Sequence, residues 1–498
     1  MLGQIKALVI ILAANFISYK LLFDISLNFI SRSEFRKWYY ICITTYFIAF
    51  VANDYWLFNF IIIFYLLNKV PNKNRLIYYC LLLPLLPYLK AAIPGFGSSN
   101  LIYITYPRVI LFSLLIPLTM SGGNKTKSIF SISSDKYIVL YLVMISSLEF
   151  RDVTFTAGMR TSFYFFIDYF IPYFAITRYI TNIKEFYIIC FSLLVPFVAI
   201  SFLSIYEAVS SWHLLADLES IFDMKKSISS YKRRDGMLRA SFSFQGSIVL
   251  GYMLMISIGL FASISGVIVK SRGMYIVIGV LICGLISSLS RGPWVGGVLL
   301  FIIFFITGRE KIKLLQKLIF AVILIIPVVI FHPSGEKIIN LIPFLDNSSD
   351  SAHSTIDYRE RLFENSMIII ERYPYFGSTN YLKTKEMEEL RQGEGIIDIV
   401  NSYLRIALNY GYIGLSAFIL IYASLLIQLY KIIRKAKNSK DIYIISARGL
   451  FATMVSMLLV IGTVSSNGRI PILYFIFAGL IASYCELIKL RKNSVNFN

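Results

Sequence analysis

Long apolar runs alternate with short polar connections along almost the whole chain. Many of the runs approach the roughly 20 apolar residues that a helix needs to cross a bilayer. Backbone polar groups in lipid must be satisfied within their own segment, so we expect these runs to be helices. The pattern predicts an all-α fold, a polytopic transmembrane helical bundle of about 14 spans. The expected spans are residues 5–22, 38–53, 55–69, 76–94, 101–120, 137–150, 162–178, 186–206, 246–266, 274–289, 293–308, 314–331, 411–430, 446–463 and 470–487.

One long polar stretch, residues 332–410, interrupts this pattern between two apolar runs. Within it Leu362, Phe363, Ile369 and Ile370 recur at helical spacing, and Pro374 and Gly377 end that helix. The stretch predicts a large, partly helical loop outside the lipid, where a membrane protein of this kind usually carries out its chemistry. The chain then divides into N-terminal transmembrane helices (1–206), an outer basic loop (207–243), further transmembrane helices (244–331), the large outer loop (332–410) and C-terminal transmembrane helices (411–498).

Composition agrees with a membrane protein, and the distribution of charged residues indicates its orientation. Hydrophobic residues make up 57% of the 498 residues and charged residues only 15%, whereas soluble domains carry roughly 25% charged residues. The net charge of +20 gathers on alternate connections, which indicates the cytoplasmic face of a membrane protein and not a nucleic-acid site. Residues 332–410 then lie on the outer side. The basic connections are 69–75, 125–127, 270–272, 309–313, 431–437 and 489–492.

Side chains that often bind metals or form disulfides are few and scattered. All five cysteines lie in apolar runs, so we expect small buried hydrophobes and neither disulfides nor metal sites. The three histidines are His213, His332 and His353. Each is expected outside the membrane or at its outer edge, where a lone histidine is usually structural.

A short motif at residues 290–294, Ser-Arg-Gly-Pro-Trp, joins two predicted spans on the outer side. Gly292 allows a tight reversal, and Pro293 suits the first turn of the next helix. The free N–H groups of that helix start and the forked donors of Arg291 together predict a small anion-binding site. The alternative is an arginine that only reaches the membrane surface from a helix end.

The outer loop 207–243 is strongly basic, against the usual bias towards cytoplasmic cations. An anionic ligand would explain this, and so would an amphipathic helix near residues 212–224 that rests on the lipid. Arg239 differs from the other cations because it enters an apolar run, where a charge needs a partner. Arg108 and Asp168 also interrupt predicted spans; they either pair with each other or line a pocket.

Four motifs, in order, resemble those of the O-antigen polymerase and ligase superfamily. Residues 290–294 are similar to its Ser-Arg-Gly-x-Trp signature, and residues 358–377 to its arginine, helix and Pro-x-x-Gly motif. Residues 401–404 and 411–415 resemble its Asn-x-Tyr-Leu and Gly-x-x-Gly-Leu block, and residues 239–246 the stretch that opens a middle span. The resemblance covers roughly residues 160–487.

The resemblance implies a metal-independent, GT-C-like membrane glycosyltransferase that needs no cofactor. Its donor would be a glycan on undecaprenyl pyrophosphate, handled on the periplasmic face of a bacterial inner membrane. The family's pyrophosphate-binding arginines correspond here to Arg239, Arg291 and Arg359, with Asn401 and Tyr403 in the same set. Arg291 would also offset charge on the leaving pyrophosphate. A flippase and a chain-length regulator are candidate partners, together with the bilayer itself; no nucleic acid is expected.

One position departs from the family pattern. Ligases carry a histidine immediately before the Asn-x-Tyr-Leu block, and Val400 stands there in this chain. Asp398, Glu394 or His353 could replace it as the base that deprotonates the attacking sugar hydroxyl. Asp398 is preferred because it lies nearest the block. Polymerases of this superfamily often lack the histidine, so the departure favours a polymerase.

The sequence therefore predicts a polymerase that joins lipid-linked oligosaccharide repeat units into O-antigen or exopolysaccharide and releases undecaprenyl pyrophosphate. The first alternative is a ligase that attaches the finished glycan to lipid A-core or protein. The second is a flippase or transporter, which would be expected to place polar groups along several helices at the middle of the membrane. This chain instead gathers its charges in outer loops and at helix ends.

Overall fold

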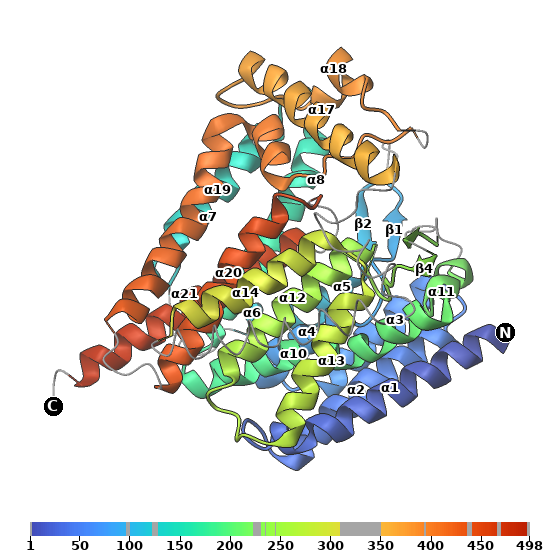
Figure 1. The fold of residues 1–498 in the computed structure, drawn as a ribbon, viewed down its shortest axis with the longest axis vertical. Helices are drawn as coiled ribbons and strands as arrows, with labels where there is room; N and C mark the ends of the chain where they lie inside the picture. The colour runs from blue at the N-terminus through green and yellow to red at the C-terminus, as the bar shows by residue number, and fades with distance from the viewer. Residues whose placement is uncertain are drawn as a thin grey trace.

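The computed structural model describes residues 2–95, 100–121, 128–222, 231–234, 236–244, 246–308, 350–392, 395–435, 441–465 and 470–495. Helices dominate it, as the apolar pattern predicted (Figure 1). Among the described residues the strands form two antiparallel hairpins. One pairs β1 (Lys90–Ile93) with β2 (Ile102–Thr105), and the other pairs β3 (Arg233–Arg234) with β4 (Met237–Leu238).

The helices follow one another with short connections. In chain order they are α1 (Leu2–Ser26), α2 (Arg32–Val51), α3 (Tyr55–Lys69), η1 (Asn72–Asn74), α4 (Arg75–Leu82), α5 (Tyr106–Ile110), η2 (Leu111–Leu115), α6 (Ile116–Met120), α7 (Asp135–Leu148), α8 (Phe155–Phe165), η3 (Phe166–Phe170), α9 (Ile171–Tyr179), α10 (Ile183–Ser210), α11 (Ala216–Ile221), α12 (Ser247–Ile264), α13 (Arg272–Ser287), α14 (Arg291–Ile306), α17 (Asp350–Arg372), η4 (Tyr381–Lys383), α18 (Lys385–Glu388), α19 (Ser402–Arg434), α20 (Ile442–Ile461) and α21 (Ile470–Val495). The η2 and η3 segments are π-helical.

Several helices are long and apolar enough to cross a bilayer. Within the described ranges there are six: Gly3–Ser26, Ile183–Ser210, Ser247–Ile264, Ser402–Arg434, Ile442–Ile461 and Ile470–Arg491. Shorter apolar helices cover Tyr55–Lys69, Tyr106–Met120, Arg272–Ser287 and Arg291–Ile306. The multi-pass helical class is thereby confirmed. The expected span at 314–331 lies outside the described residues.

The predicted span at residues 76–94 is wrong beyond its first turns. The helix α4 ends at Leu82, and the chain passes through a turn at residues 83–86 before it reaches β1. Pro84 and Pro87 follow the last helical turn, and each lacks the N–H group that would continue the helical hydrogen bonds. The next expected span, 101–120, likewise begins as strand β2 and becomes helical only at Tyr106.

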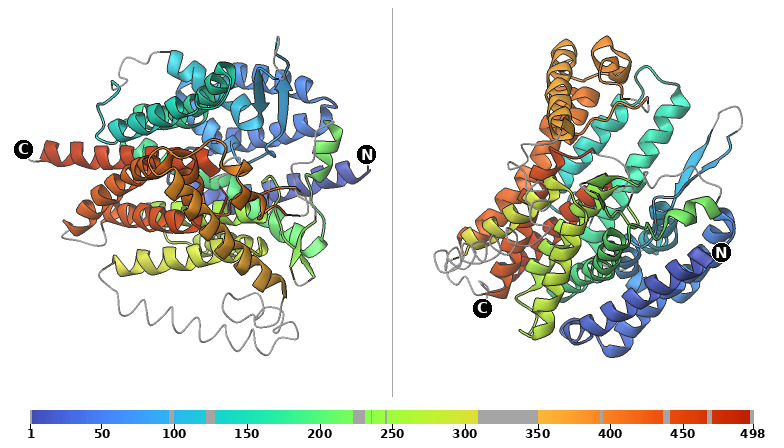
Figure 2. Two further views of the ribbon diagram at one scale, coloured as in Figure 1. Left: turned by 90° about the horizontal axis from the view of Figure 1, so that it is seen from above. Right: turned by 45° about the vertical axis from the view of Figure 1, so that its right-hand side comes forward.

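Small residues set the packing at the centre of the bundle, where α12 and α14 lie against α20. A Cβ on Gly259 of α12 would overlap Thr453 of α20, and a Cβ on Gly296 of α14 would overlap Val460. Helices in lipid gain most from such close approach, because burial in lipid gives no hydrophobic driving force between them. Seen from above, α7–α9 and α14 lie on opposite sides of α20 and α21 (Figure 2).

A separate helical segment, α17 to α18, lies across the end of the bundle where α19 begins (Figure 1). Its own apolar cluster includes Leu362, Ile369 and Ile370, three of the four residues whose spacing predicted the helix, whereas Phe363 is exposed. That cluster also takes in Leu404 and Leu408 from the first turns of α19. The predicted helix before Pro374 is thus confirmed, and α17 ends two residues before Pro374.

Candidate functional site

The site begins at the reversal between α13 and α14. The backbone turns at Leu289, whose φ is +46°, and α14 starts at Arg291 directly after its N-cap Ser290. Gly292 packs so closely that an added Cβ would lie 2.7 Å from Thr463 Oγ1, and Pro293 is buried in the first turn. A reversal at this motif is confirmed, but its expected position is wrong, because Leu289 makes the turn and Gly292 already lies in α14.

Arg239 reaches this reversal from the β3–β4 hairpin. Its Nη2 donates a hydrogen bond of 3.1 Å to Ser290 Oγ, and Arg234 Nη1 donates one of 2.9 Å to Leu289 O. We call Arg239, Ser290 and Arg291 the arginine cradle. Sequence spacing could not show this meeting, because it joins the hairpin to a helix start 51 residues away.

The charge of Arg239 is uncompensated among the described residues. No carboxylate of the described chain forms an ion pair with it, and its Nε is buried without a hydrogen-bond partner. Burial lowers the pKa of the guanidinium to about 10, and the nearby Arg234 adds to this effect. The group therefore stays cationic at neutral pH while it lacks solvation, and an anionic ligand would supply what is missing.

A buried carboxylate holds the segment that carries Arg239. Glu207, at the end of α10, has no exposed surface. Its oxygens accept hydrogen bonds from the backbone N–H groups of Leu214 (2.9 Å), Ser241 (3.1 Å) and Phe242 (2.9 Å). Hydrogen bonds to an ionised acceptor are the strong kind. Glu207 therefore fixes the backbone two residues beyond Arg239 and so orients the arginine cradle.

Of the three histidines, only His213 has a described side chain. It is buried, and its Nδ1 lies 3.2 Å from Glu207 Oε2, which makes it part of the same anchor. His332 lies outside the described residues. His353 belongs to α17, but its side chain is outside what the structure describes.

The turn after α20 connects the arginine cradle to the predicted base. Thr463 faces Gly292 at the start of α14, and two residues later Ser465 Oγ donates a 2.6 Å hydrogen bond to Asp398 Oδ1. Asp398 is half-buried. The structure thus places Gly292, at the start of α14, and Asp398 along the same short segment, 463–465, although more than a hundred residues separate them in the sequence.

Arg359 belongs to α17. Its neighbour Tyr358 holds the backbone of Asp398 with its hydroxyl, which donates to Asp398 O at 3.0 Å and accepts from Asp398 N at 3.1 Å. Arg359 is exposed and makes no hydrogen bond or ion pair with a described residue. The surrounding protein nevertheless lowers the pKa of its guanidinium by desolvation. Such a cation lies where an anion can approach it.

Asn401 and Tyr403 contact the backbone and thereby shape the site. Asn401 is the N-cap of α19, and its Oδ1 accepts hydrogen bonds from Tyr403 N (2.9 Å) and Leu404 N (3.2 Å). The Tyr403 hydroxyl donates to Leu458 O at 2.6 Å. The Asn-x-Tyr-Leu motif therefore has a local structural reason: asparagine starts the helix, and tyrosine ties it to α20.

The two glycine motifs meet in space. Gly377 and Gly411 have φ values of +68° and +65°, and a Cβ on either would overlap the backbone of the other's turn. Three backbone hydrogen bonds join the turns: Ser378 N to Leu408 O at 2.8 Å, Tyr412 N to Pro374 O at 2.7 Å and Ile413 N to Tyr375 O at 3.3 Å. The Pro-x-x-Gly sequence thus docks the α17–α18 segment onto a kink in α19.

Arg151 completes this docking, a role that the motifs and their spacing did not predict. Its guanidinium donates to the carbonyl groups of Phe376 (2.7 Å), Gly377 (3.0 Å) and Asn409 (2.8 Å). Asp152, the next residue, accepts a 3.1 Å hydrogen bond from Thr379. The connection after α7 therefore holds the α17–α18 segment from the side opposite the arginine cradle.

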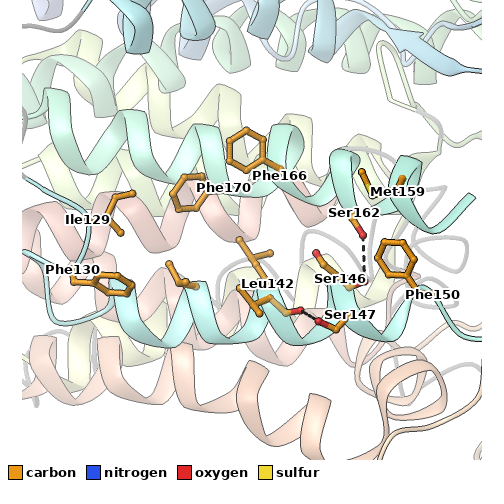
Figure 3. Close-up of a pocket in the computed structure, with 12 residues that line it drawn as sticks. Ile129, Phe130, Leu142, Ser146, Ser147, Phe150, Met159, Ser162, Phe166 and Phe170 are labelled. Carbon is orange, nitrogen blue, oxygen red and sulfur yellow. Dashed lines mark hydrogen bonds between the residues drawn. The ribbon is translucent and has the colours of Figure 1, made fainter. Parts of the chain in front are cut away.

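An apolar groove of about 610 Å³ runs between α7 and α8–η3, away from the arginine cradle. Figure 3 shows it extending from Ile129 and Phe130 at one end to Phe150 and Met159 at the other. No charged residue lines it. Across the described parts of the chain, no group of three or more His, Cys, Asp or Glu side chains is placed to hold a metal ion.

Residues 275–419 match the family model described as O-antigen ligase. The matched stretch contains Arg291, Arg359, Asp398, Asn401 and Tyr403, and Arg239 lies before it. A search of curated proteins finds no match to this chain.

Proposed function

We propose that this chain, whose residues 275–419 match the family model described as O-antigen ligase, polymerises lipid-linked oligosaccharide repeat units. The repeat units are carried on undecaprenyl pyrophosphate, and each transfer releases that carrier. The observation that supports this most is the arginine cradle: two arginines from distant segments meet at one helix start, with Asp398 on the adjoining segment.

The donor pyrophosphate binds in the arginine cradle. Arg239 and Arg291 supply cationic donors there, and the first N–H groups of α14 add the positive end of a helix dipole. Negative charge grows on the pyrophosphate as its bond to the anomeric carbon breaks. Cations fixed in place beforehand stabilise that charge in the transition state without reorganising. Arg359 approaches from α17 and adds a third cation.

Asp398 acts as the base. A hydroxyl oxygen of the acceptor sugar attacks the anomeric carbon, the bond from that carbon to pyrophosphate oxygen breaks, and the hydroxyl proton passes to Asp398. Ser465 holds Oδ1 and Tyr358 holds the backbone, so the second carboxylate oxygen is left to receive the proton. Asp398 and the start of α14, which carries the arginine cradle, both contact the 463–465 segment. The reaction requires them to be near each other, because proton removal and charge stabilisation act at the same anomeric carbon.

Val400 favours a polymerase over a ligase, because it occupies the position of the ligase histidine. The finer topology belongs to the same proposal: about 14 spans in a bacterial inner membrane, with the α17–α18 segment and the arginine cradle on the periplasmic face. A ligase that uses lipid A-core or protein as acceptor is the second candidate, supported by the description of the matched family.

Reconstitution tests the proposal. The full chain in liposomes receives undecaprenyl-pyrophosphate-linked repeat units, and we expect a ladder of products still attached to the lipid. Arg291→Ala should abolish the ladder. Arg272→Ala is the matched control. Arg272 also begins an apolar helix, α13, but it lies at the end of α13 opposite the turn that leads to Arg291.

Each alternative gives a different result. Transfer only onto added lipid A-core or protein would identify a ligase. No covalent product with any acceptor would overturn the glycosyltransferase assignment, and lipid translocation would become the next assay. A normal ladder from Arg291→Ala would exclude the pyrophosphate role of the arginine cradle.

A further inference from the structure

A second pair of cations lies at the same end of the bundle, beside the β1–β2 hairpin. Lys90 begins β1, and its Nζ lies 3.7 Å from the centre of the Tyr103 ring on β2. Arg160, on α8, donates from Nη1 to Asn100 O at 2.5 Å. Asn100 Nδ2 in turn donates to the Tyr103 hydroxyl at 2.7 Å. Tyr103 and Asn100 thus hold the two cations on one small platform.

Neither cation is neutralised within the described chain. Lys90 and Arg160 form no ion pair with a described carboxylate. Arg108, which donates to Tyr103 O at 2.7 Å, is different because it pairs with Asp168 at 2.7 Å. Burial and the charges of Arg108 and Arg160 lower the pKa of Lys90, as expected for a cation held near others. Because the fold holds like charges close together, a bound anion would stabilise it by offsetting their repulsion.

The apolar groove reaches the same turn of α8. Met159 and Ser162 line the groove, and Arg160 lies between them in sequence but points to the hairpin side. Residues spaced four apart share a helix face, and Tyr164 also faces the hairpin, since its hydroxyl accepts from Tyr103 N at 2.8 Å. One face of α8 therefore borders the apolar groove, and the other face carries the cation of Arg160.

We propose that Lys90 and Arg160 form a second anion site, which holds the pyrophosphate of the acceptor substrate while the polyprenyl chain of that substrate lies in the α7–α8 groove. This inference rests on the proposed function. A polymerase must hold two lipid-linked glycans at once, and each carries a pyrophosphate. Repulsion between the two headgroups requires two separate cationic sites.

The arrangement of the two sites fits that requirement. The β1–β2 and β3–β4 hairpins both lie toward the end of the bundle where α17 lies (Figure 1). Ser243, four residues after Arg239, donates a hydrogen bond to Pro84 O, six residues before β1. Helices α7 and α8, which line the groove, and helix α14 are on opposite sides of α20 and α21 (Figure 2). Two lipid chains would therefore approach from opposite sides, with their headgroups at the same end of the bundle.

The number of bound lipids tests the second site. Native mass spectrometry of the full chain, with undecaprenyl pyrophosphate as the probe, should show two bound molecules per wild-type chain. Lys90→Ala/Arg160→Ala should bind one. The charge-preserving Lys90→Arg/Arg160→Lys variant should bind two, which separates loss of charge from loss of folding. Lys383→Ala/Lys385→Ala, which removes two exposed cations from the α17–α18 segment, should also bind two.

The remaining outcomes separate this inference from the proposed function. Two molecules bound to Lys90→Ala/Arg160→Ala, or one bound to the wild type, would overturn the second site even if the wild type polymerises normally. Displacement of the second molecule by phosphatidylglycerol would show that a bilayer headgroup is the occupant, and would overturn the acceptor assignment. A wild type that forms no covalent product in the parallel ladder assay would overturn the proposed function itself.

Discussion

The contact between the two glycine turns gives a sharp prediction. Gly411→Ala should release the α17–α18 segment from α19 while the bundle stays folded. At Gly411 φ is +65° and ψ is −169°, a conformation that costs an L-residue about 1–3 kcal/mol. A Cβ there would also overlap the carbonyl group of Tyr375. The turn would have to move away from α19.

Moving the turn away from α19 has its own free-energy cost, which follows from the hydrogen bonds that the movement breaks. Of the three backbone hydrogen bonds that join the turns, the two beside Gly411 run from Tyr412 N to Pro374 O and from Ile413 N to Tyr375 O. Each contributes about 0.5–1.5 kcal/mol. Their loss favours the undocked state by about 1–3 kcal/mol, which is a roughly 5- to 150-fold increase in its population.

Gly395→Ala is the matched control. Its φ is +73°, and an added Cβ would meet nothing within 4 Å, so it carries the backbone strain without the overlap. Hydrogen exchange of peptides covering residues 373–380 and 408–414 measures the undocking. We expect exchange to be faster by the stated factor in Gly411→Ala only. Equal exchange in the two variants would refute the docking argument.

Three further predictions concern single carboxylates. Asp398→Asn should lower the polymerisation rate about 10²–10⁴-fold with unchanged lipid binding, and an unchanged rate would move the role of base elsewhere. Asp168→Asn should destabilise the protein by about 3–5 kcal/mol because it leaves Arg108 buried and unpaired. The temperature of thermal unfolding should return towards the wild-type value in Arg108→Met/Asp168→Leu. Failure to recover would mean that the pair does more than neutralise charge. Glu207→Gln should lower both thermal stability and polymer yield, because it loosens the backbone beside Arg239; normal values of both would exclude the anchoring role.

Apolar content predicted the membrane class and most helices, but not where an apolar segment leaves the helix. The run 76–94 is as apolar as its neighbours, and Pro84 and Pro87 turn it into an extended segment. Apolarity reports burial, and a buried segment can be helical or extended when its polar groups find partners inside the protein. The alternatives left open for Arg108 were decided by geometry: it pairs with Asp168.

The site was predicted as a set of residues but not as an arrangement. Helix-start chemistry pointed to Arg291, and the charge entering an apolar run pointed to Arg239. Their meeting depends on two other contacts. Glu207 binds backbone N–H groups just beyond Arg239, and Thr463 packs closely against Gly292, next to Arg291. Such contacts leave no periodic signal in a sequence. Arg151 was missed for the same reason, because all its partners are carbonyl groups.

The ion pair between Arg108 and Asp168 also bears on how the protein is made. Arg108 leaves the ribosome 60 residues before its partner, an interval of about 3–12 s at ordinary rates of synthesis. During that time an unpaired charge on an apolar helix costs about 2.5–3.5 kcal/mol at the membrane centre. The segment around Arg108 should therefore stay beside the insertion machinery until η3 arrives, and the two should enter the lipid together as a neutral unit.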